Sequence, residues 1–252
     1  MTIDPGWPVA VALAVLLLIA LGAHRVAGYG MGRSVLVAAV RALVQLSVVA
    51  LLIKVAVQDL VLSWLLVGVM FAMGVLTTVR RVEAPRAWSW AALAIAAGVL
   101  PVLAVVLASR AIPMQGIAII PIAGIIVGNA MTGHTLVGRR AFAALREERH
   151  QYEACLSLGM LPADAIGEII HRRAPEALYP GLDQVKTTGV VTLPGAFIGV
   201  MLGGGGPIQA ATAQVLVLFG IMAAQTITVL VAERLMCGRR LLPLDLRVAL
   251  VD

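Results

Sequence analysis

Long apolar segments constrain the fold of this chain more than any other feature. Seven occur, over residues 8–23, 35–57, 60–79, 88–109, 112–132, 188–203 and 207–235. Most approach the roughly 20 residues that a helix needs to cross a hydrocarbon core about 30 Å thick. Solid apolar runs argue against a β-barrel, whose strands would alternate apolar and polar residues. Hydrophobic residues make up 61% of the chain and charged residues only 13%. We therefore expect an all-α, polytopic integral membrane protein with seven transmembrane helices, forming a single domain over residues 1–252.

The basic residues predict the orientation of this domain. Sixteen of the 19 Lys and Arg residues follow or end the first, third, fifth and seventh segments, and the other three are Arg41, Lys54 and Arg110. Because basic residues collect in cytoplasmic loops, the N-terminus is expected outside and the C-terminus inside. No basic residue precedes the first segment, so it is expected to be a retained helix and not a signal peptide. The predicted location is the plasma or inner membrane, as a multi-pass protein. The net charge of +6 is explained by these loops, and no basic face interleaved with aromatic residues suggests a nucleic-acid partner.

A polar stretch over residues 139–182 interrupts the apolar segments, and it is expected to form a cytoplasmic elbow of two helices. Residues 141–158 combine good helix formers with apolar residues at helical spacing. Gly159 suits the left-handed turn that ends a helix, and Pro162 suits the first position of the next one. That second helix carries an apolar stripe of Ala165, Ile166, Ile169 and Ile170. The stripe is compatible with docking to a partner or with lying on the membrane surface.

The elbow also carries a recognisable spacing, Glu153-Ala154-x4-Gly159-x9-Ile169. This spacing resembles the EAA loop of ABC-transporter permeases, where such permeases dock their ATPase. The resemblance implies that Glu153, Ala154, Gly159 and Ile169 couple this chain to a separate ATPase subunit. His171 and Arg172 stand where that loop would carry Leu-Pro, which is a departure from the importer pattern.

Polar residues inside the apolar segments are candidates for a transport pathway or gate. Arg41 lies deep in the second segment, with Gln45 one helical turn later. A buried arginine in a membrane usually faces the protein interior and has a partner or a task. Four further candidates lie in or beside the fifth segment, namely Met114, Gln115, Asn129 and Met131. The alternatives are interhelical hydrogen bonds for the polar side chains and core packing for the methionines.

Two segments carry glycines four residues apart, a spacing that lets another helix approach closely. These are Gly124 and Gly128 in the fifth segment, and Gly195, Gly199 and Gly203 in the sixth. The glycine faces are expected to be helix contacts, either at the seam of a homodimer or within one chain.

The chain carries no motif that predicts catalysis or a bound cofactor. Neither of its two lysines, Lys54 and Lys186, follows a glycine as the lysine of a nucleotide-binding loop would. Its four histidines make no zinc-binding pattern, so no metal site can be assigned. Cys155 and Cys237 are expected to be free thiols on the cytosolic side. A pump of this kind would need its ATP to be used by a partner subunit, and we expect no enzyme.

Several blocks of residues resemble the FetB-type permease family of ABC exporters, over about residues 33–235. The blocks are Arg41-Ala42-x-x-Gln45-Leu46, Ile112-Pro113-Met114-Gln115, Ile120-Pro121-Ile122-Ala123-Gly124, Gly128-Asn129-Ala130-Met131, Leu156-Ser157-Leu158-Gly159 and Asp183-x-x-Lys186-Thr187-x-Gly189-x-Val191-x-Leu193-Pro194-Gly195. That family includes bacterial iron exporters and plant aluminium-tolerance relatives linked to nucleotide sugars. The resemblance implies a permease with seven spans that works with an ABC ATPase.

These observations predict the membrane subunit of an ABC transporter, in a homodimer with two ATPase chains. The expected cargo is a transition-metal cation such as iron, and a nucleotide sugar is the alternative within the same class. A motor-independent channel or secondary transporter is the alternative from another class. Secondary transporters usually couple through membrane carboxylates, whereas Asp59 and Glu233 lie at the edges of their segments.

Overall fold

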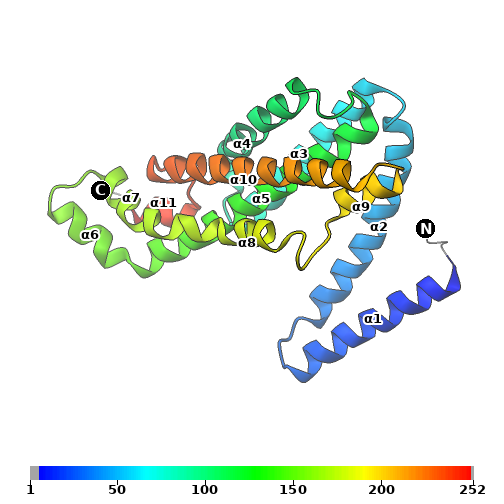
Figure 1. Cartoon of the computed structure of the whole chain (residues 1–252). Coiled ribbons are helices and arrows are strands. Elements are labelled where there is room, and N and C mark those ends of the chain that lie inside the picture. Colours follow the sequence, from blue (N-terminus) through cyan, green and yellow to red (C-terminus); the bar gives the residue numbers. More distant parts are fainter. Residues whose placement is uncertain (1–5, 251–252) are drawn as a thin grey trace. The chain divides into compact units, whose positions relative to one another are not determined.

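The computed structural model describes residues 6–250, and helices account for nearly all of its regular structure (Figure 1). No strand occurs among these residues, although Thr188 and Thr192 form an isolated β-bridge. The helices are α1 (Trp7–Val26), α2 (Gly32–Ala56), α3 (Leu60–Arg81), α4 (Trp88–Ala108), α5 (Gly116–Glu147), α6 (Arg149–Ser157), α7 (Pro162–Arg173), α8 (Tyr179–Thr187), α9 (Gly195–Leu202), α10 (Pro207–Cys237) and α11 (Leu244–Ala249), with 3-10 turns η1 (Pro85–Ala87) and η2 (Ala174–Ala177).

The predicted fold class is confirmed, because six of the described helices are long and apolar enough to cross a membrane. They are α1 to α5 and α10. One of them continues well past its predicted apolar segment. The fifth segment was expected to end at residue 132, but α5 continues to Glu147, and α10 continues to Cys237. The extension of α5 carries charged residues away from the apolar part of that helix, whereas α10 ends only two residues beyond its predicted segment.

The sixth predicted helix, over residues 188–203, is wrong as a continuous element. Only α9, which covers Gly195–Leu202, is helical there, and residues 188–194, here called the linker, are not. Gly189 has a φ of +89°, which ends the helical path after α8. Pro194 has no backbone N–H and adopts an extended conformation immediately before α9.

Contacts between residues divide the chain into two units, Met1–Asp59 and Leu60–Asp252. The described part of the first unit is a hairpin of α1 and α2. Its turn contains Gly28 and Gly30, both with positive φ, which allows the chain to reverse within a few residues. Ala56 is the one buried residue among the described residues of this hairpin.

In the second unit, α3, α4, α5 and α10 pack together as a core, and glycines set how closely they approach. Gly98 of α4 faces the carbonyl group of Ala224 and the hydroxyl group of Thr228 on α10. Further along, Gly220 of α10 lies against Val102 of α4. Residue numbers rise on α4 as they fall on α10, so these two helices are antiparallel. Small residues let membrane helices approach until backbones touch, because lipid supplies no hydrophobic driving force between helices.

By the same reasoning, α3, α5 and α10 run parallel to one another. Four contacts establish this direction: Gly124 with Met70, Gly138 with Val82, Gly220 with Ile126, and Gly133 with Val229. The numbers rise together in each pair of helices. The helices α3, α5 and α10 therefore cross the membrane in one direction, and α4, which contacts all three, crosses in the opposite direction. The successive spans α3, α4 and α5 thus alternate in direction, as expected.

Because α5 and α10 are parallel, the chain between them must return across the membrane. It does so through α8, the linker and α9, which follow α10 in turn (Figure 1). Gly181 of α8 lies against the side chain of Gln225, and Gly205, in the turn after α9, lies against Val200 and Gln209. The sixth crossing is therefore a broken helix. It begins near Tyr179, within the stretch that the sequence assigned to the polar elbow.

Replacing Gly98 should destabilise the second unit, because a side chain there would overlap the Ala224 carbonyl and the Thr228 side chain. We expect Gly98→Leu to cost about 2 kcal/mol or more, the scale of an overpacked core. Gly68→Leu is the matched control, since nothing lies within 4 Å of that position. Thermal unfolding followed by fluorescence-detected size exclusion measures both. Equal melting temperatures for the two variants would contradict the packing described for α4 and α10.

Candidate coupling elbow and membrane pathway

The elbow consists of α6 and α7, joined by a tight turn, and local sequence explains each part of it. Gly159 has a φ of +85°, the left-handed conformation predicted for it, and Pro162 is the first residue of α7 as predicted. The single helix expected over residues 141–158 is wrong, because the chain breaks at Glu148 between α5 and α6. The first part of that stretch is thus the end of a membrane helix, and α6 alone forms the first arm of the elbow.

The apolar stripe of α7 packs against α5 and α10. Ala165, Ile166, Ile169 and Ile170 are all fully buried. Outside the hydrocarbon core, each fully buried isoleucine contributes about 1.5–3 kcal/mol. The structure thus places Ile169 in the core and not on an exposed docking surface. Its contribution is to fix the elbow to the two long helices.

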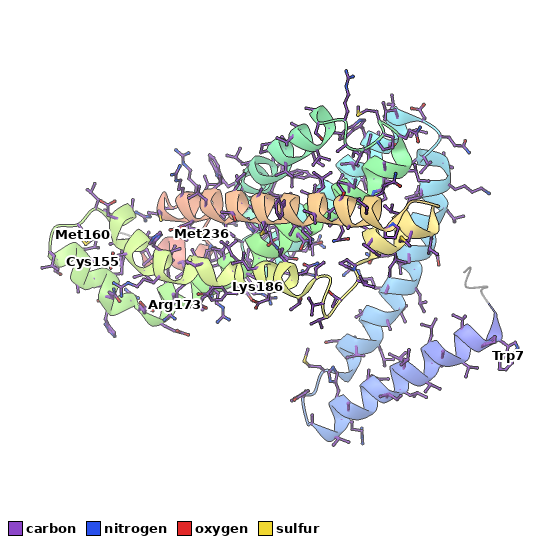
Figure 2. The ribbon with its side chains drawn as sticks, in the orientation of Figure 1. Trp7, Cys155, Met160, Arg173, Lys186 and Met236 are labelled. Carbon is purple, nitrogen blue, oxygen red and sulfur yellow. The ribbon has the colours of Figure 1, made fainter. Side chains whose placement is uncertain are left out.

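The opposite side of the elbow remains exposed. Glu153 is exposed and forms an ion pair with Arg149 at 3.0 Å, and Ala154 beside it is also exposed. At the turn, Leu158 is 84% exposed and Leu161 is 67% exposed. Cys155 and Met160 lie at the same free end of the elbow (Figure 2). An exposed apolar turn beside charged residues is a candidate docking surface.

Polar contacts connect the elbow to the ends of α5 and α10 on several sides. The guanidinium group of Arg173 donates to Glu148 at 3.1 Å, and His171 pairs with Glu233 of α10 at 2.8 Å. A further contact joins α5 to α11 and not to the elbow, since Arg146 donates to Asp245 at 2.8 Å and thereby lowers the pKa of that carboxyl group. Water screens exposed polar contacts of this kind, so the isoleucine packing remains the larger effect.

Arg41 and Gln45 lie on one exposed face of α2, as their spacing predicted. They line a groove of about 550 Å³ together with Leu36, Val37, Val40 and Val44. Within the described residues of this first unit, Asp59 is the one acidic side chain, and it lies beyond the end of α2. The groove therefore presents a cation among apolar side chains.

The structure does not bring the four candidates of the fifth segment together. Met114 and Gln115 lie exposed at the start of α5. Asn129 lies fourteen residues after Gln115, which is about 21 Å along a helix. Its carbonyl oxygen accepts a hydrogen bond from the amide of Gln225 at 3.2 Å, so this part of α5 is engaged in packing. Met131 is half-buried and lies near Gly74 of α3.

The glycine faces differ in what they contact. A methyl group added at Gly124 would meet Met70, which confirms a helix contact within the chain. Gly128, Gly195 and Gly199 have no neighbour of that kind within 4 Å among the described residues, and Gly203 meets only the end of its own helix. For these four the seam of a homodimer stays a prediction.

Sequence reasoning missed a buried polar cluster that joins α3 to α5. The Thr78 hydroxyl group lies 2.7 Å from the Thr135 hydroxyl group and 3.1 Å from Nδ1 of His134. All three residues are buried. The signal was present, because three polar side chains interrupt apolar helices, but sequence alone does not show that they meet. The described residues contain no cluster of three or more His, Cys, Asp or Glu side chains that could hold a metal ion.

Three known proteins are similar to this chain in sequence. The chain is 32% identical over 202 residues to the "UPF0014 membrane protein STAR2" of Oryza sativa subsp. japonica, covering 79% of this chain and 71% of that protein. It is 30% identical over 204 residues to the "UPF0014 membrane protein YjkA" of Bacillus subtilis, covering 79% and 81%. It is 33% identical over 144 residues to the "Probable iron export permease protein FetB" of Escherichia coli, covering 57% and 55%.

No solved structure matches the chain. The uncharacterised protein family UPF0014 matches residues 7–241, nearly the whole length of the chain. The blocks that resemble FetB-type permeases, the apolar helices and the family match agree. This chain is therefore a multi-pass membrane protein that belongs to the UPF0014 family.

Proposed function

We propose that this chain is the membrane permease subunit of an ABC transporter and exports a transition-metal cation, most simply iron. A separate ATPase chain supplies the energy and binds the ATP. Two copies of the permease and two ATPase chains form the working complex, in the plasma or inner membrane, with the N-terminus outside and the elbow in the cytosol.

The observation that carries this proposal is the two-sided construction of the elbow. One side is fixed to α5 and α10 by buried isoleucines, and the other side presents Glu153, Ala154 and an apolar turn to the surroundings. A partner that binds the exposed side moves two membrane helices through α7, because α7 follows α6 at the Gly159 turn and is packed on both of them.

The elbow then acts as a rigid lever. ATP binding draws the two ATPase chains together and carries the docked elbows with them. Since α7 is packed on both α5 and α10, their membrane portions tilt with the elbow, and access switches from one side of the membrane to the other. The core contacts at Gly98 and Gly220 carry the motion onward to α4.

The choice of cargo is supported by one relative whose printed name is an iron export permease. A second candidate cargo is an anion such as a nucleotide sugar, and the exposed guanidinium group of Arg41 favours it. An arginine in an apolar groove attracts negative charge and repels a bare cation. The two candidates share the ATPase-driven mechanism and differ in what accumulates when the permease is lost.

Substitutions on the exposed side of the elbow should uncouple ATP hydrolysis from the permease. We expect Glu153→Lys and Gly159→Pro to abolish permease-stimulated ATP hydrolysis, because the first reverses a charge on the docking face and the second prevents the left-handed turn. Glu147→Lys is the matched control, since it reverses an exposed charge at the end of α5 and outside the elbow. Hydrolysis is measured in proteoliposomes containing both subunits. Normal co-purification and hydrolysis with both elbow variants would contradict the proposed docking.

Arg41 should matter for transport more than for folding. A guanidinium group facing lipid is costly, so its place on α2 is expected to face a pathway or gate. We expect Arg41→Ala to reduce transport at least about tenfold, as a loss of 1.4 kcal/mol or more would do. Arg33→Ala, at the start of the same helix, is the control. Wild-type transport by Arg41→Ala in proteoliposomes would remove this residue from the pathway.

Loss of the permease should identify the cargo. If iron is exported, cells lacking the chain accumulate iron and become sensitive to peroxide, and both effects are reversed by the wild-type gene but not by Glu153→Lys. Elemental analysis and peroxide survival measure this. Unchanged iron with an altered distribution of a nucleotide sugar would reject the metal cargo and leave the anionic candidate.

A further inference from the structure

We propose that the linker between α8 and α9 is a water-exposed section of the transport pathway, whose backbone carbonyl and threonine hydroxyl oxygens bind a cation during passage. The inference rests on the proposed transport function, and it assigns the place and the ligand chemistry of a cargo site.

The linker lies near the middle of the membrane. Gly181 meets Gln225, which is 18 residues after the start of α10 at Pro207, or about 27 Å along that helix. The turn after α9 marks the other end of this distance, because Gly205 lies beside Gln209. The eight residues of α9 occupy about 12 Å from that end. The linker therefore lies about midway between these two ends, and with one edge of a hydrocarbon core about 30 Å thick set at Pro207 it falls close to the centre of that core.

At this depth the linker leaves backbone oxygens without partners. The amide groups of Gly189 and Val191 donate to Thr192 and Thr187, at 2.8 and 2.9 Å. In the part of the chain that the structure describes, the carbonyl oxygens of Thr188, Gly189, Val190, Val191 and Leu193 accept no hydrogen bond. Unbonded backbone groups are not tolerated against lipid, but occur where they line a water-filled cavity or bind an ion.

The exposed side of the linker is consistent with such a cavity. Val190 is 90% exposed and Val191 is 74% exposed. On helices in lipid, exposed valines need no explanation, but here they accompany unsatisfied carbonyl groups on the same backbone. Water, a cation or protein must therefore meet this surface.

The ligand chemistry favours a cation that prefers oxygen. Carbonyl and hydroxyl oxygens suit hard and borderline divalent cations, and unwound backbone at the centre of a broken helix is where transporters coordinate ions. Thr188 and Thr192 add hydroxyl oxygens to the carbonyl groups. Asp183, one turn before the end of α8, adds a carboxylate that pairs with Lys186 at 3.7 Å. Lys186 lies on α8 next to the linker (Figure 2).

The first experiment tests whether the linker is wet. In a chain with Cys155 and Cys237 changed to alanine, Val190→Cys is compared with Phe219→Cys, which lies exposed on α10 at a similar depth. A thiol in lipid stays protonated and unreactive, whereas a thiol in water reacts as the thiolate. We expect Val190→Cys to react with charged methanethiosulfonate reagents and Phe219→Cys to remain inert. Equal inertness of both would overturn the proposal, because the linker would then be covered by protein.

The second experiment tests the ligand class, with Mn²⁺ as a redox-stable probe that prefers oxygen ligands. We expect a cationic reagent to modify Val190→Cys faster than an anionic one, and Mn²⁺ to slow the reaction. Changing Thr188 and Thr192 to valine should raise the Mn²⁺ concentration needed for protection at least about tenfold. Thr212→Val on α10 is the control. Thr192→Val alone replaces the double variant if that one does not fold. Faster reaction with the anionic reagent, or no protection by Mn²⁺, would overturn the cation assignment.

Both experiments use the permease alone in liposomes. They therefore give the same result whether or not an ATPase docks on the elbow. If the linker is accessible to water and protected by Mn²⁺ but the elbow variants leave ATP hydrolysis unchanged, the proposed ATPase coupling is rejected and the cation site stands. If the linker is inaccessible to water but the elbow variants abolish stimulated hydrolysis, the cation site is rejected and the ATPase coupling stands.

Discussion

Every backbone amide and carbonyl group inside hydrocarbon needs a partner, and this constraint shapes the whole chain. Six long helices meet it by bonding internally. The broken crossing formed by α8, the linker and α9 does not, because Gly189 ends the helical path and Pro194 lacks the N–H that would continue it. The protein therefore carries, near the centre of its membrane portion, a backbone whose oxygens need water, an ion or another chain. Such an exception is costly enough to require compensation, which is why it indicates a functional place in the molecule.

Different forces hold the helices of the second unit together inside the membrane and outside it. Within the membrane, glycines at positions such as 98 and 220 let helices pack by close contact, since lipid offers no hydrophobic driving force. Beyond the membrane, water drives the burial of the α7 isoleucines against α5 and α10. The same two helices take part in both kinds of packing. In the proposed mechanism, a displacement of α7 thus passes along the continuous helices α5 and α10 into the glycine contacts.

The sequence predicted the long spans well, because hydropathy reports a property that lipid itself requires. It predicted Gly159 and Pro162 from their backbone preferences alone. It failed over residues 188–203, because an apolar run indicates burial in lipid but not an unbroken helix. The adjacent β-branched residues Val190 and Val191 and the following Pro194 were the signals in the sequence that favoured a break. It also placed Ile169 on a docking face. Periodicity shows that a helix has an apolar face, but which surface covers that face depends on residues distant in the sequence, here those of α5 and α10.

A linker built from neutral oxygens suits a transporter better than a strong metal site would. Conduction and export require binding that is favourable enough for entry and weak enough for release. Carbonyl and hydroxyl groups carry only partial charges, and the nearby carboxylate of Asp183 is already paired with Lys186. A cation at the linker therefore gains attraction from several weak dipoles without meeting a full, uncompensated negative charge. Small changes in the spacing of α8 and α9 would alter that sum, because the helices carry the two ends of the linker. In the proposed mechanism, movement of the elbow, which continues into α8 through η2, thus changes the affinity for the cation without any residue that binds the metal permanently.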